Sequence, residues 1–420
     1  MRLCTLAFAL LSAVALPAAA QAPVDGPARR PSSRPPGVSP NDAAGLRALD
    51  GTFSDISTAS GGPSLNGNVT GVAVAPDGSF YVAGAFSRAG ATPAATVARW
   101  DGARWSALGR GLGGDDPESI TDRVLALGPD GSLYAGGNFT TAGGATVNGV
   151  ARWDGAAWHA VGGGVSGNPG ATFNFSVYAL AFGRDGSLYV GGVFVTAGGV
   201  PASNIARWDG TAWSAVGSGV SNVNGSTAPV YALAVGPDGS VYAGGQFTRA
   251  GGIPASNVAR WDGTAWSALG SGTDRTVRSL AVGADGSLFA LGVFRVAGGV
   301  AAVRVARWDG SAWSALSSGI TGEVRTLAAT TDGSVYVGGR FTTVGGVPAR
   351  NIARWDGSAW SAVGGGTDSE VRVLAVAPAG GLVAGGSFSE TVWRSYPRRR
   401  TISRIALSWT IASLTAGNAS

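Results

Sequence analysis

The sequence predicts an all-β protein: a seven-bladed β-propeller whose blades are four-stranded antiparallel sheets. Three observations support this prediction: a long repeat, a constant spacing inside that repeat, and incomplete copies of it at both ends of the array. The repeat joins three phrases, PDGSLYAGGxF, TxAGGxPAxN and ARWDGxAWSAxG, and each of its six copies carries one marker tryptophan: Trp100, Trp153, Trp208, Trp261, Trp308 and Trp355. Repeats of roughly 40 to 50 residues with four short strands are typical of radial β-architectures.

The length of each repeat varies at one place only. The aspartate of the DGS phrase and the aspartate of the following WDG phrase are 24 residues apart in every copy, as with Asp77 and Asp101. The connection from WDG to the next DGS phrase spans 29, 31 and 29 residues in the first three copies and 23 in the later ones. The variable connections are therefore predicted to be surface loops at one end of the blades, where contact with a partner is best tolerated.

The fourth copy illustrates the strands expected in each blade. Residues 230–235 form a short apolar run before Asp238-Gly239, and residues 240–247 are predicted as the returning strand. Residues 257–261 and 265–269 are predicted as the third and fourth strands, on either side of Asp262-Gly263. Each Asp-Gly pair is predicted to form a two-residue hairpin turn with a positive φ at both central positions.

A seventh blade is predicted from the two incomplete copies. Residues 371–388 resemble the first half of a repeat, with Ala379-Gly380-Gly381 in place of DGS. Residues 49–56, LDGTFSDI, resemble the phrase WDGTAWSAV with one residue deleted. Pairing of the N-terminal and C-terminal strands in one shared blade would close the ring and leave no exposed sheet edge. We therefore expect the β-propeller to span residues 45–388.

The segments outside the repeats are predicted to have other roles. Residues 1–20 combine Arg2, an apolar stretch and a final Ala-Ala-Ala, which indicates a secretory signal peptide, too short to span a membrane. Residues 21–44 are rich in Pro, Ser and Arg and are expected to form a disordered linker, and residues 389–420 form an irregular basic tail. We expect a secreted protein of the periplasm or cell surface, without a transmembrane segment.

Charge and composition argue against several functions for the predicted core. The chain has a formal net charge of +5, but residues 49–388 carry −2 and show no basic stripe, so nucleic acid is not an expected partner. Cleavage of the signal peptide would remove Cys4, the only cysteine. His159, the only histidine, takes a position that is serine in five other copies, which indicates a surface strand site rather than a catalytic base. No catalytic set and no cofactor is expected, and the protein is predicted to be a monomer.

The repeat SVYVGGRFTTVGGVPARNIARWDGSAW at residues 334–360 resembles the delta-60 type β-propeller repeat of large bacterial surface and secreted proteins. It is more distantly similar to kelch repeats, which carry a Gly-Gly pair on the second strand, here Gly338-Gly339, and later aromatic residues, here Trp355 and Trp360. The resemblance covers residues 45–388. It implies an extracytoplasmic propeller and supplies no shared catalytic site.

The repeated aromatic and charged residues are assigned structural roles. The paired tryptophans of the WDGxxW phrases are expected to fill the core rather than to stack on sugars. The repeated aspartates are expected to serve turn geometry rather than to bind calcium. The arginine before each marker tryptophan is expected to stack on an aromatic ring or to pair with a turn carboxylate. These arginines are Arg99, Arg152, Arg207, Arg260, Arg307 and Arg354.

Candidate binding residues come from the long loops between the blades. Two loops bring together aromatic and amide side chains that suit a carbohydrate: Phe173, Asn174, Phe175, Asn222 and Asn224. A third loop clusters four carboxylates as a weak calcium candidate: Asp115, Asp116, Glu118 and Asp122. This cluster lacks the ligand spacing of a known calcium motif, so no metal is assigned to it.

The sequence favours a secreted or surface-exposed propeller that acts as a non-enzymatic binding or structural module, with a carbohydrate or another surface protein as its partner. The alternative is an extracellular hydrolase or lyase that acts on a polysaccharide in the central channel. The positions of four acidic residues discriminate between the two: Asp274, Glu323, Asp368 and Glu370. Convergence on one pocket would favour the enzyme, whereas scattered positions would indicate solvated loop residues.

Overall fold

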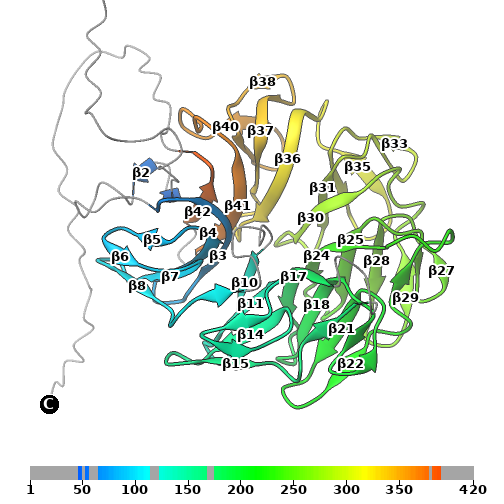
Figure 1. Ribbon diagram of the computed structural model, residues 1–420. Helices are drawn as coiled ribbons and strands as arrows, with labels where there is room; N and C mark the ends of the chain where they lie inside the picture. The colour runs from blue at the N-terminus through cyan, green and yellow to red at the C-terminus, as the bar shows by residue number, and fades with distance from the viewer. Residues whose placement is uncertain are drawn as a thin grey trace, which may run out of the picture. The chain divides into compact units, whose positions relative to one another are not determined.

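A computed structural model describes residues 46–49, 53–55, 65–113, 123–167, 175–377 and 381–388, with backbone only for the first two ranges. Every regular element in these ranges is a β-strand, and each strand pairing is antiparallel (Figure 1). Within the same ranges, no helix has the length and apolar character required to cross a bilayer. The predicted signal peptide, linker and basic tail lie outside the described residues.

Six sheets each take four main strands from one repeat, in the order first, second, third and fourth strand, and the sixth sheet also contains the short strand β38 (Val347–Pro348). They are β3 (Asn68–Val74), β4 (Phe80–Ala85), β7 (Val97–Trp100) and β8 (Trp105–Ala107); β10 (Arg123–Leu127), β11 (Leu133–Gly137), β14 (Val150–Trp153) and β15 (Trp158–Ala160); β17 (Ser176–Phe182), β18 (Leu188–Val193), β21 (Ile205–Trp208) and β22 (Trp213–Ala215); β24 (Val230–Val235), β25 (Val241–Gly245), β28 (Val258–Trp261) and β29 (Trp266–Ala268); β30 (Val277–Val282), β31 (Leu288–Gly292), β34 (Val305–Trp308) and β35 (Trp313–Ala315); and β36 (Ile320–Ala329), β37 (Val335–Val344), β39 (Ile352–Trp355) and β40 (Trp360–Ala362). The strands predicted for the fourth repeat agree with β24, β25, β28 and β29 to within two residues at each end.

A further sheet joins the two ends of the repeat array. Its order is β2 (Phe53–Asp55), β1 (Leu46–Leu49), β42 (Leu382–Gly386) and β41 (Val371–Val376), with Leu49 opposite Leu382. The first strands of successive sheets contact one another: β3 contacts β10, and the contacts continue through β17, β24, β30 and β36 to β41, which in turn contacts β3. These strands lie nearest the centre in Figure 1, and the fourth strands lie at the periphery.

The turns after the first strands differ from the predicted two-residue form. Only the glycine has a positive φ, 84° at Gly239, whereas Asp238 does not. The Gly239 N–H donates to the carbonyl of Gly236 at 3.0 Å, and the Gly236 N–H donates to the carbonyl of Ser240 at 2.8 Å. The loop is thus a three-residue turn that ends in a left-handed glycine, and the turns that carry arginine, alanine or threonine at the position of Pro237 form the same two hydrogen bonds.

The AGGxPA phrases form short hairpins at the same end of the sheets as the interblade connections. In the fourth repeat, Ala250 pairs with Ile253 and also with Val220 from the preceding connection. The two-residue strands of this kind are β5 (Arg88–Ala89), β6 (Thr92–Pro93), β9 (Leu112–Gly113), β12 (Thr141–Ala142), β13 (Ala145–Thr146), β16 (Val165–Ser166), β19 (Thr196–Ala197), β20 (Val200–Pro201), β23 (Val220–Ser221), β26 (Arg249–Ala250), β27 (Ile253–Pro254), β32 (Val296–Ala297), β33 (Val300–Ala301) and β38 (Val347–Pro348). They extend the blades beyond the four main strands.

The core fills the spaces between neighbouring sheets. From Trp158 to Trp360, the second tryptophan of each pair donates its indole N–H to a backbone carbonyl of the preceding repeat. Trp313 is 5% exposed, and it donates to the carbonyl of Leu269 at 2.8 Å. Its partner Trp308 lies 5.5 Å away between ring centroids and is half-buried. The predicted packing role of the tryptophans is confirmed, because their bulk and their hydrogen bonds join neighbouring sheets.

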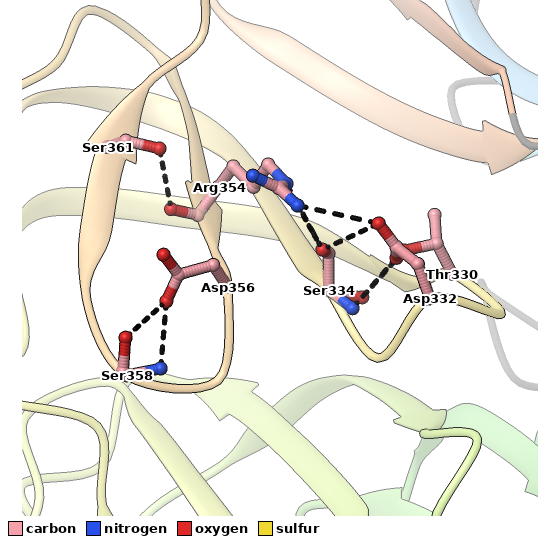
Figure 2. A network of polar contacts seen from close by, with 7 residues as sticks. All are labelled: Thr330, Asp332, Ser334, Arg354, Asp356, Ser358 and Ser361. Carbon is pink, nitrogen blue, oxygen red and sulfur yellow. Dashed lines mark hydrogen bonds and ion pairs between the residues drawn. The ribbon is translucent and has the colours of Figure 1, made fainter.

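The repeated arginines and aspartates hold the turns together, as predicted. Figure 2 shows the sixth copy, where the Ser334 N–H donates to Asp332 at 3.0 Å and Arg354 Nη2 donates to Ser334 Oγ at 2.7 Å and to Asp332 Oδ2 at 3.4 Å. In the WDG turn, Asp356 Oδ1 accepts hydrogen bonds from the backbone N–H and the hydroxyl of Ser358, both at 2.8 Å. These charges are satisfied locally, so they form structural turns and not a binding ring.

Candidate functional site

The first strands of the sheets place one corresponding residue each around a central cavity. The position lies seven residues before the turn aspartate, or before Ala379 in the last copy, and it is occupied by Thr70, Arg123, Tyr178, Tyr231, Arg278, Arg325 and Arg372. All seven line one cavity of about 550 Å³, together with Val124, Val177, Gln246 and Thr276. A position that repeats once per blade therefore becomes a continuous lining.

A β-bulge aims most of these side chains into the cavity. In β30, the pairing with β31 shifts between Val277 and Ser279, so Arg278 is the extra residue on the bulged strand. Equivalent shifts leave Thr70, Tyr178, Tyr231, Arg325 and Arg372 as the extra residues of their strands. A bulged residue leaves the ladder and its side chain is redirected, which explains why Val277 is fully buried while the adjacent Arg278 is only half-buried.

Arg123 departs from this pattern. The β10–β11 pairing has no register shift, and Arg123 lies opposite Gly137, where the other strands have a buried valine. The residue is only 3% exposed, and Arg123 Nη1 donates to the carbonyl of Gly84 at 2.7 Å. Burial disfavours the charged form and lowers the pKa of Arg123 to about 10, so the guanidinium remains a cation at neutral pH.

Three successive strands give the cavity an arginine arc, which we define as Arg278, Arg325 and Arg372. Arg325 Nε donates to Glu370 Oε1 at 2.6 Å, and Arg372 Nε donates to Glu370 Oε2 at 3.0 Å. Arg325 also bonds Glu323 Oε2 at 3.1 Å. Arg278 has no hydrogen-bond or ion-pair partner among the described residues. One end of the arginine arc is thus paired with Glu370 and Glu323, whereas Arg278 at the other end pairs with no carboxylate among the described residues.

The strands that carry the arginine arc are fixed to one another by side-chain hydrogen bonds. The Leu327 N–H donates to Ser279 Oγ at 3.1 Å, and the Leu374 N–H donates to Thr326 Oγ1 at 3.2 Å. Ser279 directly follows Arg278 and Thr326 directly follows Arg325, so each bond ties one bulge to the next strand. The spacing of the three guanidinium groups is therefore set by the backbone rather than by loops.

Tyr178 and Tyr231 occupy the adjoining part of the wall. Their ring centroids are 5.2 Å apart with an interplanar angle of 40°, and both residues are half-buried. In blade order they lie between Arg123 and Arg278. The central cavity thus combines an aromatic wall with a cationic wall, and no carboxylate is among its lining residues.

Three further cavities open at the same end of the strands. One of about 670 Å³ shares Arg325 and Arg372 with the central cavity, and one of about 530 Å³ shares Arg278. The arginines that these two add are Arg275, Arg295, Arg304, Arg340 and Arg350. The fourth cavity, of about 500 Å³, shares Thr276 and Gln246 with the centre. The basic surface is therefore not confined to the centre but extends over neighbouring blades.

The four acidic residues chosen to discriminate between functions do not all come together. Glu323, Asp368 and Glu370 line the cavity of about 670 Å³, whereas Asp274 lines the cavity of about 500 Å³. Asp274 Oδ1 accepts hydrogen bonds from the backbone N–H groups of Arg295 and Val296, at 2.8 and 2.9 Å. Three of the four thus converge, in a cavity that also holds four arginines.

The electrostatics of Glu370 follow from its position. Burial by itself would raise the pKa of Glu370, but the hydrogen bonds and charges of Arg325 and Arg372 outweigh it and hold this pKa below its usual value. The side chain of Glu370 is 11% exposed and both of its oxygens are engaged. Glu370 is consequently an ionised structural partner of the arginine arc.

The loop residues predicted to bind carbohydrate are only partly placed. Phe173 and Asn174 lie outside the described residues, and Phe175 packs with the buried residues between β10 and β17. Asn222 and Asn224 do line one cavity, of about 500 Å³. Asn222 Nδ2 donates to the carbonyl of Thr227 at 2.8 Å, and Asn224 Oδ1 accepts from Ser226 Oγ at 2.7 Å, so both amides also shape their own loop.

Among the described residues, no three His, Cys, Asp or Glu side chains are grouped so that they could hold a metal ion. The calcium candidates Asp115, Asp116, Glu118 and Asp122 lie outside those residues. His159 Nε2 lies 2.7 Å from Asp154 Oδ2 in a WDG turn and is half exposed, which agrees with a surface strand site.

Sequence reasoning missed the arginine arc, although a signal for it exists. Arg278, Arg325 and Arg372 are each 47 residues apart and follow a valine in the phrase VRxLA. The same position is tyrosine in the phrase VYALA of two earlier copies. A position that is variable within an otherwise regular strand indicates a residue that does not serve the core.

Family comparisons agree with this architecture. Residues 221–380 match the model of the Rax2 C-terminal beta propeller domain, and residues 128–153 and 183–208 match a beta-propeller domain of unknown function, DUF5122. The chain contains a β-propeller. The propeller has no match among curated proteins.

Solved structures similar to this propeller have varied activities. They include a virginiamycin B lyase from Staphylococcus aureus with quinupristin (9% identity, TM-score 0.45, 76% of this chain and 94% of that chain) and PorZ, a surface component of the type-IX secretion system of Porphyromonas gingivalis (16%, 0.47, 80% and 48%). A PQQ-bound aldose sugar dehydrogenase from Streptomyces coelicolor is also similar (20%, 0.36, 75% and 99%). The propeller spans about half the length of PorZ. At these identities and TM-scores, none of the three bears on the function of this chain.

Proposed function

We propose that this chain is a secreted, seven-bladed, closed β-propeller of the delta-60 type that acts as a non-enzymatic binding module. The observation that carries the binding role is the central cavity, in which residues from seven first strands converge. Small-ligand sites are concave, with a few polar groups that converge on the ligand. The propeller thus presents its ligand site at the end of the strands where the interblade connections lie.

The contacts between strands support the closed ring. β41 contacts β3, and β1 pairs with β42, so the blade built from both ends of the array lies beside the first complete blade. A sheet edge left open there would invite pairing with other chains. The secreted location rests on the predicted signal peptide, residues 1–20. The loop residues Asn222 and Asn224 stay candidates for contact with a partner at the rim.

A non-enzymatic role is supported by the state of the carboxylates. Glycosidases require one carboxyl group with a raised pKa as general acid and a second as base or nucleophile. The pKa of Glu370 is lowered instead, and both of its oxygens accept hydrogen bonds from arginines. Glu323 likewise accepts from Arg325. Glu370 is therefore ionised at neutral pH and has no proton to donate, and its lowered pKa makes it a weaker base.

One observation favours the second candidate, an extracellular hydrolase or lyase that acts on a polysaccharide: Glu323, Asp368 and Glu370 line the same cavity. A glycan array together with hydrolase and lyase assays on the purified chain separates the two functions. We expect binding without turnover. Turnover that is abolished by Glu323→Gln, Asp368→Asn or Glu370→Gln, with binding retained, would establish the enzyme instead.

A further inference from the structure

The central cavity is electrostatically unusual within this domain. Four arginines and no carboxylate line it, although residues 49–388 carry a formal charge of −2. Like charges that converge in a cleft repel one another, so their clustering is unfavourable unless an anion compensates for it. Glu370 pairs with Arg325 and Arg372 from the side and Glu323 pairs with Arg325, whereas Arg278 has no ion-pair partner among the described residues. Low-dielectric walls concentrate the resulting field and attract anions.

Arg278 is the group best prepared for a ligand. It is half-buried at a bulge, the hydrogen bond from Leu327 to Ser279 fixes its backbone, and its guanidinium has no partner among the described residues. A guanidinium presents two parallel N–H donors that match the two oxygens of a carboxylate. Holding the arginine in advance reduces the entropy lost on binding.

The adjoining wall supplies a different chemistry. Tyr178 and Tyr231 present ring surface beside the arginine arc, and Thr70, Thr276 and Gln246 add neutral polar groups. Sugar rings have an apolar C–H face that packs on aromatic rings, and hydroxyl groups that exchange hydrogen bonds with amides and alcohols. A ligand that satisfies both walls carries sugar rings and a planar anionic group.

We infer that the central cavity binds a carboxylate-bearing saccharide, with its carboxylate on Arg278 and its ring against Tyr178 and Tyr231. This inference rests on the proposed binding role and names the class of ligand. A cavity of about 550 Å³ is of the size that small-ligand sites have. The basic cavities beside it, with Arg275 and Arg340, allow a longer acidic chain to continue over the neighbouring blades.

Titration calorimetry with trigalacturonate as the probe tests the inference on the purified full chain, with neutral galactotriose as the size-matched comparison. We expect binding of trigalacturonate only, weakened by added salt because the attraction is partly screened. Arg278→Gln should weaken the binding of trigalacturonate about tenfold or more. Arg278→Lys should bind more tightly than Arg278→Gln but more weakly than the wild type, since lysine keeps the charge but loses the planar fork. Arg184→Gln is the matched control. Arg184 is exposed in the turn that follows β17, at the end of this strand far from the cavity, and its replacement removes the same charge.

Each other outcome is decisive. The inference would be overturned if galactotriose bound equally well, if Arg278→Gln bound trigalacturonate with unchanged affinity, or if trigalacturonate did not bind. Tighter binding of sulfated galactotriose would show that the cavity selects a sulfated saccharide rather than one with a carboxylate, and would also overturn the inference. Circular dichroism checks that each variant is folded. If Arg278→Gln does not fold, the loss of affinity is measured with Arg278→Lys instead. If the chain binds a neutral glycan or a protein but not trigalacturonate, the proposed binding function is retained and the inference of an acidic ligand is contradicted. Cleavage of trigalacturonate would have the opposite meaning, because it would support an acidic-saccharide site and contradict the proposed non-enzymatic function.

Discussion

Arg325 Nε lies 2.6 Å from Glu370 Oε1, and this contact joins two neighbouring blades at the edge of the central cavity. Glu370 directly precedes β41 and Arg325 lies on β36. The two residues are 45 positions apart in the chain. The second oxygen of Glu370 binds Arg372 at 3.0 Å. One carboxylate thereby sets the orientation of two of the three residues of the arginine arc.

Replacement of Glu370 by glutamine should destabilise the propeller by about 1–2 kcal/mol at pH 7, since hydrogen bonds between charged groups are lost. The pKa of Glu370 is lowered in the folded state, so its contribution is fully present above the unfolded pKa and disappears as pH falls through the folded pKa. Urea unfolding of both proteins at pH 7 and near pH 3 measures this, and the difference should shrink in acid. Glu323→Gln, at a more exposed side chain, should cost less than about 1 kcal/mol.

The turn ion pairs predict a second pH dependence. The hydrogen bond from Arg260 is the largest influence on Asp238 and contributes to lowering its pKa to about 2. Asp238→Asn removes the charge but keeps the oxygen that accepts from the Ser240 N–H at 3.0 Å. The wild-type protein should have the higher melting temperature above about pH 4, and the gap should close toward pH 2. A gap that persists unchanged at pH 2 would show that the ion pair is not its cause.

The indole hydrogen bond between blades is testable at Trp313. Trp313→Phe removes the donor to the carbonyl of Leu269 and part of the packing, so we expect a loss of about 1–3 kcal/mol in the free energy of unfolding. Trp308→Phe, at the half-buried neighbour, should cost less. Guanidinium titrations of both variants followed by circular dichroism give the comparison, and equal losses would argue against a role for the interblade bond.

Asn257 combines a left-handed backbone with a link to the next connection. Its φ is 65°, and its Nδ2 donates to the carbonyl of Thr273 at 2.8 Å. Asn257→Ala should lose about 1–3 kcal/mol, because alanine is strained at this φ and carries no donor. Asn257→Gly relieves the strain alone and should fall between the two proteins in urea unfolding. An alanine variant as stable as the glycine variant would show that strain contributes nothing.

Removal of residues 21–56 tests the closed ring. It deletes β1 and β2, so the backbone of β42 loses its partner and should pair with other chains. Light scattering after size exclusion should show larger species whose proportion rises with concentration. Removal of residues 21–44 alone is the control and should leave a monomer. If the shorter chain stays monomeric with unchanged unfolding, the N-terminal strands do not seal the propeller.

Much of the fold could be predicted from local patterns. The β24 and β25 hairpin follows from an apolar run, a Pro-Asp-Gly turn and a second apolar run, all within residues 230–245. The error in the turn type was local, since the turn spans three residues, Pro237 to Gly239, rather than Asp238 and Gly239 alone. The short AGGxPA hairpins were missed because two-residue strands have too few side chains to show an alternating pattern.

The candidate site was harder to predict because it depends on contacts distant in sequence. The loop residues Asn222 and Asn224 were chosen for composition, and their amides prove to bond their own loop. Arg278, Arg325 and Arg372 are single residues on strands that otherwise face the core, so their pattern resembles that of any inner strand. A bulge in each strand, which composition does not reveal, redirects them.

The repeat, the positions of its turns and the all-β architecture follow from local sequence, because each blade folds through hydrogen bonds between residues close in the chain. The packing of the sheets brings residues spaced by 47 positions into one cavity, where Glu370 pairs with two of them and Arg278 has no ion-pair partner among the described residues. The physical reason is that charge in a cavity depends on which side chains neighbouring sheets bring together, and that depends on sheet packing and on the local bulge rather than on composition.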